Sequence, residues 1–468
     1  MLESNVYRDY RATASISLPP VRIVHLGAGA FFRSHAAWFT HRANAGVAEP
    51  WGIAAFTGRS PRAAEQLDQQ DGLYHLITRD GETSSSEVVG SVSAAYDGTD
   101  ASAWRASMAS ADTSILTLTV TERGYRVTAA GELDALDLEV ISDIDLLRST
   151  LHARSSTMPV SAPGRIVDGL LSRRASGAGA IAILSCDNLP SNGEVTRAVV
   201  LAVARQVDPE LGFWIEKNVS FPSCVVDRIT PAVELAPVQF ETGDQDLVPV
   251  LAEPHAEWII VDDFPAGRPQ WEVAGARFVH DVDAFEQRKL WMLNGAHTAL
   301  ATLGIPRGLA TVAEAISDPY CSAKVESLWD DAERFIELPE GELKEYRETL
   351  RSRFANGGIE HRLAQIDKDA MTKIALRIIP ILRLTALPGR DISTAAIAVV
   401  ATWMTTVLAV SAVGTGNSPK ILVDDVKDAL AQLGASDLAG NDVVVEHILA
   451  GCSAAPVPHR VEEHVARP

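Results

Sequence analysis

The first part of the chain alternates short apolar runs with longer segments whose apolar residues recur at helical spacing. Four apolar runs rich in β-branched residues predict β-strands. They cover residues 21–26, 51–56, 113–120 and 180–184. Strands that alternate with helices indicate a mostly parallel sheet with helices on both of its faces.

The pattern changes near residue 285, where apolar positions repeat every three or four residues over long stretches. These stretches predict five helices separated by proline and glycine breakers. The helices are expected at 285–303, 321–337, 340–355, 371–387 and 393–413. Alternating apolar positions at 232–276 predict extra strands that complete the first domain.

The length of 468 residues exceeds what one hydrophobic core normally holds, so two domains are expected. The predicted fold class is α/β. An N-terminal α/β domain at 1–283 is followed by a mostly α-helical domain at 284–468.

Composition and charge narrow the possible partners. The residues are 47% hydrophobic, the mean hydropathy is +0.06 and the net charge is −20. A strongly acidic chain is a poor partner for nucleic acid or for an anionic membrane, because both need a basic surface. No apolar stretch reaches the roughly 18 residues that a membrane-spanning helix needs. We therefore expect neither nucleic acid nor a membrane as a partner.

The cysteines give no sign of a metal site or a redox pair. The four of them lie far apart without a CxxC pair, at Cys186, Cys224, Cys321 and Cys452. A zinc knuckle and a redox dithiol both need closer spacing, so the sequence predicts no metal site. Reduced thiols, together with an N-terminal segment that lacks an apolar core, predict a cytoplasmic location.

The stretch HLGAGAFFRSH, residues 25–35, places a G-x-G turn between a strand and a helix. In a dinucleotide-binding fold the first glycine permits the tight turn, and the second lets the backbone approach the pyrophosphate. The candidate cofactor-binding residues are Gly27, Ala28, Gly29, Ala30 and Phe31. Phe32 stands where a third glycine is common, so an ordinary βα turn remains the alternative.

The choice between NAD and NADP depends on the end of the second predicted strand. Residues 57–60 contain no acidic side chain to hold a ribose 2′-hydroxyl. Arg59 is a candidate for stacking on adenine or binding a 2′-phosphate, and a solvated surface arginine is the alternative. The cofactor is therefore NAD or NADP, with NAD as the first choice.

The stretch KLWMLNGAHTALATLG, residues 289–304, interrupts an apolar helix with polar groups. At 100° per residue, Glu286, Asn294 and His297 project from the same side of the helix as Lys289. Burial of an amine is costly and commonly lowers the pKa of a lysine, which makes it a general base near neutral pH. A single core histidine that is merely hydrogen-bonded is the alternative for His297.

This stretch resembles the signature K-L-x-x-L-N-x-x-H-[ST] of the polyol-specific long-chain dehydrogenases, a family that includes mannitol 2-dehydrogenase and fructuronate reductase. Other blocks resemble the family in the same order, at residues 25–35, 70–76, 117–125, 185–193 and 226–231. The resemblance covers about residues 22 to 410. It implies a metal-independent oxidation of a secondary alcohol with a nicotinamide cofactor. It also implies that residues 1–283 form a Rossmann-like NAD(P)-binding domain and residues 284–468 a helical substrate and catalytic domain.

The resemblance also implies roles for individual residues. Lys289 corresponds to the general base, and Asn188 and Asn294 to the amide pair that holds the developing alkoxide oxygen. His297 corresponds to a residue that positions the substrate, and Glu286 to one on the exit path of the proton. From the sequence alone, Asn188 also fits a plain turn residue and Glu286 a first-turn helix acid.

Three further residues match substrate-side positions, namely Asp227, Gln365 and Lys373. Asp227 also fits an internal ion pair with Arg228. The block 356–377 departs from the family pattern, since Gly357 replaces a proline and Ala370-Met371 replaces Gly-Ser. These departures affect the expected substrate more than the expected chemistry.

One extra cation beside the catalytic lysine favours a neutral, mannitol- or arabinitol-like polyol and its ketose. A hexuronate such as fructuronate or tagaturonate is the alternative, because a carboxylate prefers an arginine or a second cation. The hexuronate alternative would be favoured if Arg362, Arg377 or Arg383 faced the site. A nucleotide-binding protein without turnover is a further alternative. We expect a monomer or a weak homo-oligomer.

Overall fold

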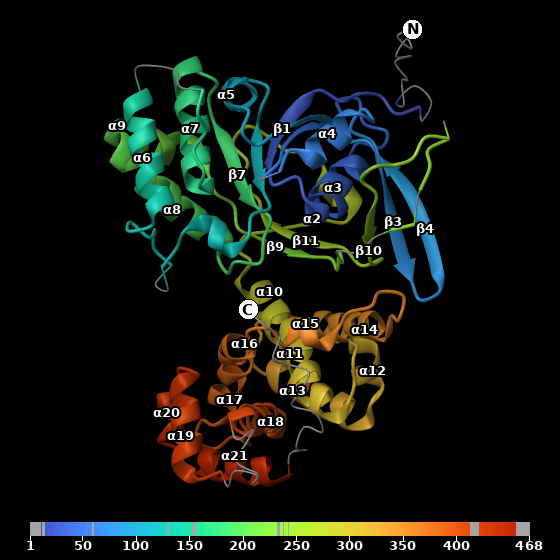
Figure 1. The fold of residues 1–468 in the computed structure, drawn as a ribbon, viewed down its shortest axis with the longest axis vertical. Helices are drawn as coiled ribbons and strands as arrows, with labels where there is room; N and C mark the ends of the chain where they lie inside the picture. Colours follow the sequence, from blue (N-terminus) through green and yellow to red (C-terminus); the bar gives the residue numbers. More distant parts are fainter. Residues whose placement is uncertain are drawn as a thin grey trace. The chain divides into compact units, whose positions relative to one another are not determined.

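The computed structural model describes residues 11, 15–58, 60–128, 131–151, 156–231, 235–236, 238–241, 243–411 and 421–454. The chain divides into two compact units, Met1–Asp283 and Ala284–Pro468 (Figure 1).

The first unit is built on a six-stranded parallel sheet in the order β5-β2-β1-β6-β7-β8. The strands are β1 (Val21–Leu26), β2 (Gly52–Phe56), β5 (Val92–Tyr96), β6 (Ile115–Leu118), β7 (Ile181–Ser185) and β8 (Val219–Ser220). The chain builds outward from β1 on one side and from β6 on the other. This is the Rossmann strand order, which confirms the predicted fold class, and its switch point lies between β1 and β6.

Alternate residues of the central strands enter two different cores. In β1, Val24 and Leu26 face one core, whereas Ile23 faces the other. Because successive side chains of a strand point to opposite faces, a strand covered on both faces needs a continuous apolar run. That requirement explains why the sequence pattern located β1, β2, β6 and β7 to within a few residues.

The helices of the first unit cover this sheet. They are α2 (Ala30–Ser34), α3 (Ala36–Ala43), α4 (Arg62–Asp68), α5 (Ala101–Ala109), α6 (Leu138–Thr150), α7 (Ala162–Ser176), α8 (Asn192–Val207) and α9 (Pro209–Asn218). The ends of α7 show why its residues form a helix. Ser161 caps the first turn by accepting from the Gly164 N–H, and Gly177 ends the helix in the left-handed region.

Two three-stranded sheets complete the first unit. They contain β3 (Tyr74–Asp80), β4 (Thr83–Val89) and β10 (Val250–Ala252), and β9 (Cys224–Asp227), β11 (Glu257–Val261) and β12 (Arg277–Val279). β10 and β11 confirm the strands expected at 232–276. β3, β4 and β5 were not predicted, and β4 shows why: its sequence TSSSEVV is largely polar and mostly exposed, so it carries no buried face.

The second unit is helical. It contains α10 (Asp283–Arg288), α11 (Gly295–Gly304), α12 (Val312–Ser317), α13 (Pro319–Glu333), α14 (Glu340–Ala355), α15 (Leu363–Ile366), α16 (Ala370–Arg377), α17 (Ile379–Thr385), α18 (Thr394–Ser411), α19 (Val423–Gln432), α20 (Ser436–Ala439) and α21 (Asp442–Ala454). The bounds of α14 match the prediction. The helix predicted at 371–387 is two helices, because Pro380 lies in the first turn of α17.

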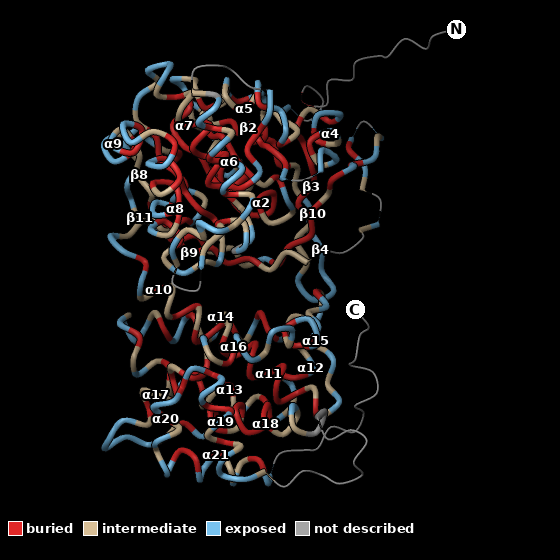
Figure 2. The backbone as a smooth tube through the Cα atoms, turned by 60° about the vertical axis from the view of Figure 1, so that its left-hand side comes forward, coloured by how far each residue is buried: buried red, intermediate tan, exposed pale blue. Residues whose placement is uncertain are grey.

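The core of the second unit surrounds α11. All 10 residues of α11 are buried, and α12, α13, α15, α16 and α18 pack against it. Buried backbone runs through α11, α13 and α18 (Figure 2). Within the described residues, no helix has both the length and the apolar character needed to cross a membrane.

Candidate functional site

The segment that carries the candidate lysine is a π-helix, η3 (Lys289–Asn294), between α10 and α11. The N–H of Gly295 donates to the carbonyl of Leu290, five residues earlier. A regular rotation of 100° per residue is therefore wrong for this stretch, because each π turn holds more residues than an α turn. Short π segments inside α-helices occur frequently at functional sites, since they redirect a few side chains.

Lys289 is buried at the start of the π-helix. Its exposure is 9%, and the following residues Trp291, Met292 and Leu293 are buried. Glu286 is half-buried one helical turn earlier, on α10. An amine at this depth is largely removed from bulk water.

The end of the π turn is held by two side chains. The hydroxyl of Thr298 donates to the Asn294 carbonyl at 3.0 Å. Arg377, the last residue of α16, donates to the same carbonyl at 3.4 Å and to the Thr298 hydroxyl at 3.2 Å. The backbone at Asn294 is therefore fixed by neighbours from two helices.

His297 packs within a cluster of rings. It is 8% exposed, and its ring centroid lies 4.8 Å from those of Phe354 and His361. Burial, followed by the nearby charge of Arg353, lowers the pKa of His361. His361 is therefore neutral at neutral pH, so His297 has no cationic imidazole beside it.

The other candidate residues of the second unit lie near the same helix. The Lys373 amine donates to the Ile366 carbonyl at 2.7 Å, and burial followed by the charge of Arg377 lowers its pKa. Gln365 is exposed on α15, which packs against α11.

The sequence did not decide which of three arginines faces the site, and the structure places them differently. Arg362 pairs with Glu360 at 2.8 Å, and Arg383 pairs with Asp437 at 2.7 Å. Arg377 contacts Asn294, as described above. Of these three, Arg377 is thus the one that the structure places beside a candidate catalytic residue.

In the first unit, the glycine turn lies at the switch point of the sheet. Gly27 has φ +109, and a Cβ there would lie 2.5 Å from the Thr119 carbonyl oxygen. The N–H groups of Gly27 and Ala28 donate to the Phe56 carbonyl at 2.9 and 3.1 Å. Gly27 is therefore required for the shape of the turn.

The backbone conformation at position 29 does not require a glycine. The backbone of Gly29 is ordinary, with φ −83, and the nearest atom to an added Cβ would be 3.8 Å away. It precedes Ala30, where α2 begins with Phe31 as its second residue. The space above Gly29 fits a group that approaches the backbone closely, as a pyrophosphate does. Arg59, the other candidate cofactor residue, lies outside the described residues.

His25 supports this turn and was missed by the sequence analysis. Its Nε2 lies 3.1 Å from the Gly27 carbonyl and its Nδ1 2.8 Å from the Thr117 hydroxyl. A carbonyl only accepts, so Nε2 carries the proton and Nδ1 accepts from Thr117. Burial lowers the pKa of His25 to about 3, against the opposing effect of the Gly27 carbonyl. The available signal was a polar residue inside an apolar strand just before the glycines.

Asn188 lies in the loop that follows β7, at the edge of the sheet that also holds the glycine turn. It is exposed. Its neighbour Asp187 accepts from the Tyr125 hydroxyl and from the Leu189 N–H. The Asx turn at Asp187 agrees with a turn position for Asn188 and also leaves its side chain accessible.

Asp227 is buried at the end of β9, opposite Glu257 of β11. Its Oδ2 lies 3.7 Å from the His255 Nε2, and possible ligand atoms of Asp227, His255 and Glu257 all lie within 4.8 Å of one another. A protonated His255 would pair with Asp227. Arg228 points its guanidinium at the carbonyls of Ser34 and Glu253, at 2.6 and 3.2 Å.

Comparison with known proteins agrees with this architecture. The family model described as the mannitol dehydrogenase Rossmann domain matches residues 21–273, and the mannitol dehydrogenase C-terminal domain matches residues 281–449. The chain is 37% identical over 376 residues to D-mannonate oxidoreductase from Escherichia coli (strain K12), covering 78% of this chain and 75% of the relative.

Two further relatives act on mannitol by their names. Mannitol 2-dehydrogenase from Aspergillus terreus (strain NIH 2624 / FGSC A1156) is 35% identical over 375 residues, covering 76% of this chain and 72% of that protein. The solved structure of Pseudomonas fluorescens mannitol 2-dehydrogenase in a ternary complex with NAD and D-mannitol is 31% identical. It superposes with a TM-score of 0.75, covering 93% of this chain and 92% of that chain.

Replacing each of the two glycines of the turn by alanine is expected to affect a different property, either stability or nucleotide binding. Gly27→Ala should lower the free energy of unfolding by more than about 1 kcal/mol, because it adds a left-handed alanine and a clash with a carbonyl. Gly29→Ala should keep the stability but weaken the binding of NADH and NADPH at least tenfold. Thermal unfolding and fluorescence titration measure the two effects. Equal nucleotide affinity in Gly29→Ala and the unchanged protein would contradict the pyrophosphate assignment.

His25 should make stability depend on pH. Its folded pKa lies below its unfolded value of 6.5. Between those pH values the unfolded chain binds a proton that the folded chain does not. The contribution of neutral His25 to the free energy of unfolding is fully present above pH 6.5. Below that pH it is lost by about 1.4 kcal/mol per pH unit. The stability gap between the unchanged protein and His25→Gln should narrow by about 1 kcal/mol from pH 7 to pH 5.5 in urea unfolding. A constant gap would argue against a buried neutral imidazole.

Proposed function

We propose, starting from the fact that this chain belongs to the mannitol dehydrogenase family of oxidoreductases, that it interconverts an open-chain polyol and its ketose. The substrate would be mannitol- or arabinitol-like and the cofactor NAD or NADP. The observation that carries the proposal is the π-helical turn η3, where an amine, an amide and the following imidazole interrupt a buried apolar helix.

Oxidation of a secondary alcohol removes a proton from oxygen and a hydride from carbon. A bound nicotinamide supplies the hydride acceptor, and the residues suited to hold its pyrophosphate are Gly27 to Phe31. Lys289 accepts the hydroxyl proton as the general base, which its low exposure favours. The carbonyl product then forms without a free alkoxide in solution.

Neutral donors suit the oxygen that becomes alkoxide-like. Asn188 and Asn294 are assigned to this role, because an amide N–H stabilises developing negative charge without adding a proton that Lys289 must compete for. The carbonyl of Asn294 is anchored by Thr298 and Arg377, so its backbone is already fixed before a substrate binds.

The remaining assignments concern orientation and proton release. His297 would hydrogen-bond the substrate from its ring cluster, and Glu286 would receive the proton from Lys289 on its way to solvent. Asp227, Gln365 and Lys373 would contact the hydroxyl groups farther from the reacting carbon. These roles add binding energy and orientation rather than chemistry.

Replacing the proposed base should abolish turnover. Lys289→Ala is expected to lower kcat for polyol oxidation at least a hundredfold, since general base catalysis commonly contributes 10² to 10⁴. Initial rates with mannitol, arabinitol and sorbitol, each with NAD and NADP, measure this effect. Lys344→Ala on α14 is the control, because its exposed amine pairs with Glu340. Turnover that persists in Lys289→Ala would remove the lysine from the mechanism.

A second candidate function is the reduction of a hexuronate to its sugar acid. Two observations favour it: the 37% identity to D-mannonate oxidoreductase, and the position of Arg377 beside Asn294 with Lys373 one turn earlier on α16. Two cations on one helix face suit a carboxylate better than a neutral hydroxyl chain.

Lys373→Met should separate these two functions. If the substrate is a sugar acid, loss of a charged hydrogen bond is expected to raise KM about tenfold or more. If it is a neutral polyol, the change should stay within about threefold. KM for mannitol and for fructuronate measures the difference, and Lys368→Met is the control because that lysine is exposed just before α16. Comparable effects in both variants would exclude a specific substrate contact of Lys373.

A further inference from the structure

The π turn that carries the candidate base has a hydrogen bond from outside its own helix. The indole N–H of Trp329, on α13, donates to the Met292 carbonyl at 2.8 Å. Met292 lies in the middle of η3, between Lys289 and Asn294. A π segment is less stable than an α-helix of the same length, so it depends on contacts that stabilise its altered backbone.

Trp329 is itself tightly surrounded. Its exposure is 0%, and it stacks on Phe354 at a centroid distance of 6.2 Å. Phe354 in turn contacts the ring of His297 at 4.8 Å. Trp329 therefore contacts the candidate segment directly at the Met292 carbonyl. It also contacts His297 indirectly, through the ring of Phe354.

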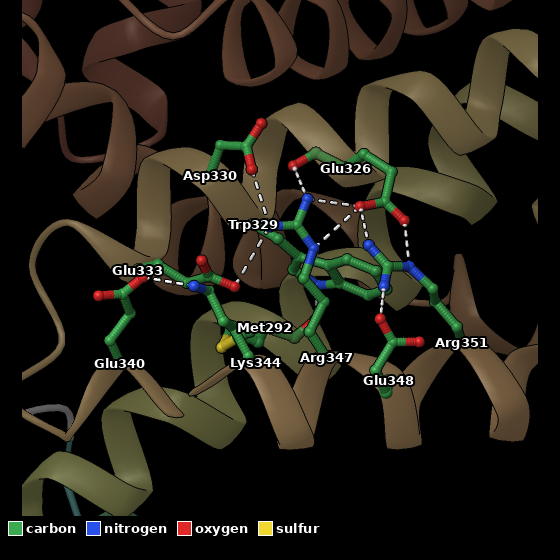
Figure 3. A network of polar contacts seen from close by, with 10 residues as sticks. All are labelled: Met292, Glu326, Trp329, Asp330, Glu333, Glu340, Lys344, Arg347, Glu348 and Arg351. Carbon is green, nitrogen blue, oxygen red and sulfur yellow. Dashed lines mark hydrogen bonds and ion pairs between the residues drawn. The ribbon is translucent and has the colours of Figure 1, made fainter. Parts of the chain in front are cut away.

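A network of charges fixes the indole in place (Figure 3). The guanidinium carbons of Arg347 and Arg351, on α14, lie 5.5 and 5.9 Å from the centroid of the Trp329 ring. Both distances fall within the range of cation–π attraction.

Glu326 ties the two arginines to α13, one turn before Trp329. It accepts from Arg347 Nε at 2.9 Å and from Arg351 Nε and Nη2 at 2.6 and 2.7 Å. Arg347 also donates to the Glu326 backbone carbonyl at 3.1 Å and to Asp330 at 2.7 Å. Although partial burial acts to raise the pKa of Glu326, hydrogen bonds from Arg351 and Arg347 outweigh it and lower that pKa. The carboxylate is therefore ionised at neutral pH.

We propose that Trp329 is a positioning residue, whose indole N–H holds the Met292 carbonyl and thereby fixes the π turn from which Lys289 and Asn294 project. The Glu326–Arg347–Arg351 network holds the indole in the orientation that this bond needs. The inference rests on the proposed function for its effect on turnover, but the hold on the π turn stands apart from any substrate.

The test is Trp329→Phe, which keeps an aromatic ring and removes the N–H donor. We expect kcat to fall about ten- to a hundredfold, because small misplacements of a catalytic group are costly. KM should change less than about threefold, since the variant removes none of the residues proposed to contact the substrate. The matched control is Trp271→Phe in the first unit, where an equally buried indole donates to the Thr40 hydroxyl at 3.0 Å.

A second variant, Arg347→Gln, keeps Trp329 and weakens only its support. It should lower kcat in the same direction by a smaller factor. If Trp329→Phe does not fold, as shown by its circular dichroism, Arg347→Gln carries the test alone.

Hydrogen–deuterium exchange supplies a readout that needs no substrate. Peptides covering residues 289–298 should exchange faster in Trp329→Phe and in Arg347→Gln, but at the unchanged rate in Trp271→Phe. Unchanged exchange in these peptides, or an equal loss of kcat in Trp271→Phe, would overturn the proposal. If the unchanged protein turned over no substrate, the proposed function would fail, and the exchange rates alone would decide whether Trp329 holds the π turn.

Discussion

The burial of a lysine within an apolar helix is the constraint on which the second unit depends. Burial of an amine costs free energy, and the surrounding helices must offset that cost with dense packing. The wholly buried α11 follows the lysine segment directly, and Thr298 and Arg377 hold the Asn294 carbonyl at the end of that segment. The lysine therefore stands at the start of a segment that side chains from neighbouring helices hold in place.

In the first unit, the candidate cofactor turn depends on the shape of its backbone. A turn that a phosphate can approach closely must be narrow and rigid, without a side chain at the point of closest approach. Gly27 makes the turn narrow, because its backbone passes close to Thr119. A neutral His25 stabilises the turn through its contact with the Gly27 carbonyl. His25 stays uncharged, whereas Arg33 brings a cationic side chain to this turn, where its Nη1 donates to the Ala28 carbonyl at 3.2 Å.

Much of the fold could be predicted from the sequence, for identifiable reasons. The bounds of β1 and α14 were predicted correctly, because β1 is a short apolar run covered on both faces and α14 has apolar positions at the helical period. β4 was missed because a polar, exposed strand has no such period. The π turn at 289–294 could not be seen, since one extra residue per turn leaves the apolar run unbroken. The candidate residues came from the family resemblance, whereas the roles of His25, Arg377 and Trp329 depend on partners far away in the sequence.

The shortest strand of the main sheet has a consequence for solubility. β8 contributes only Val219 and Ser220 to its edge, and α9 leads directly into it. A sheet edge of two residues exposes few unpaired backbone groups, so it is a poor template for a strand of another molecule. A Rossmann sheet whose central strands are this apolar would aggregate readily if its edge were long and flat. The short β8 therefore disfavours edge-to-edge association at its own side of the sheet, whereas β5 (Val92–Tyr96) forms the opposite edge.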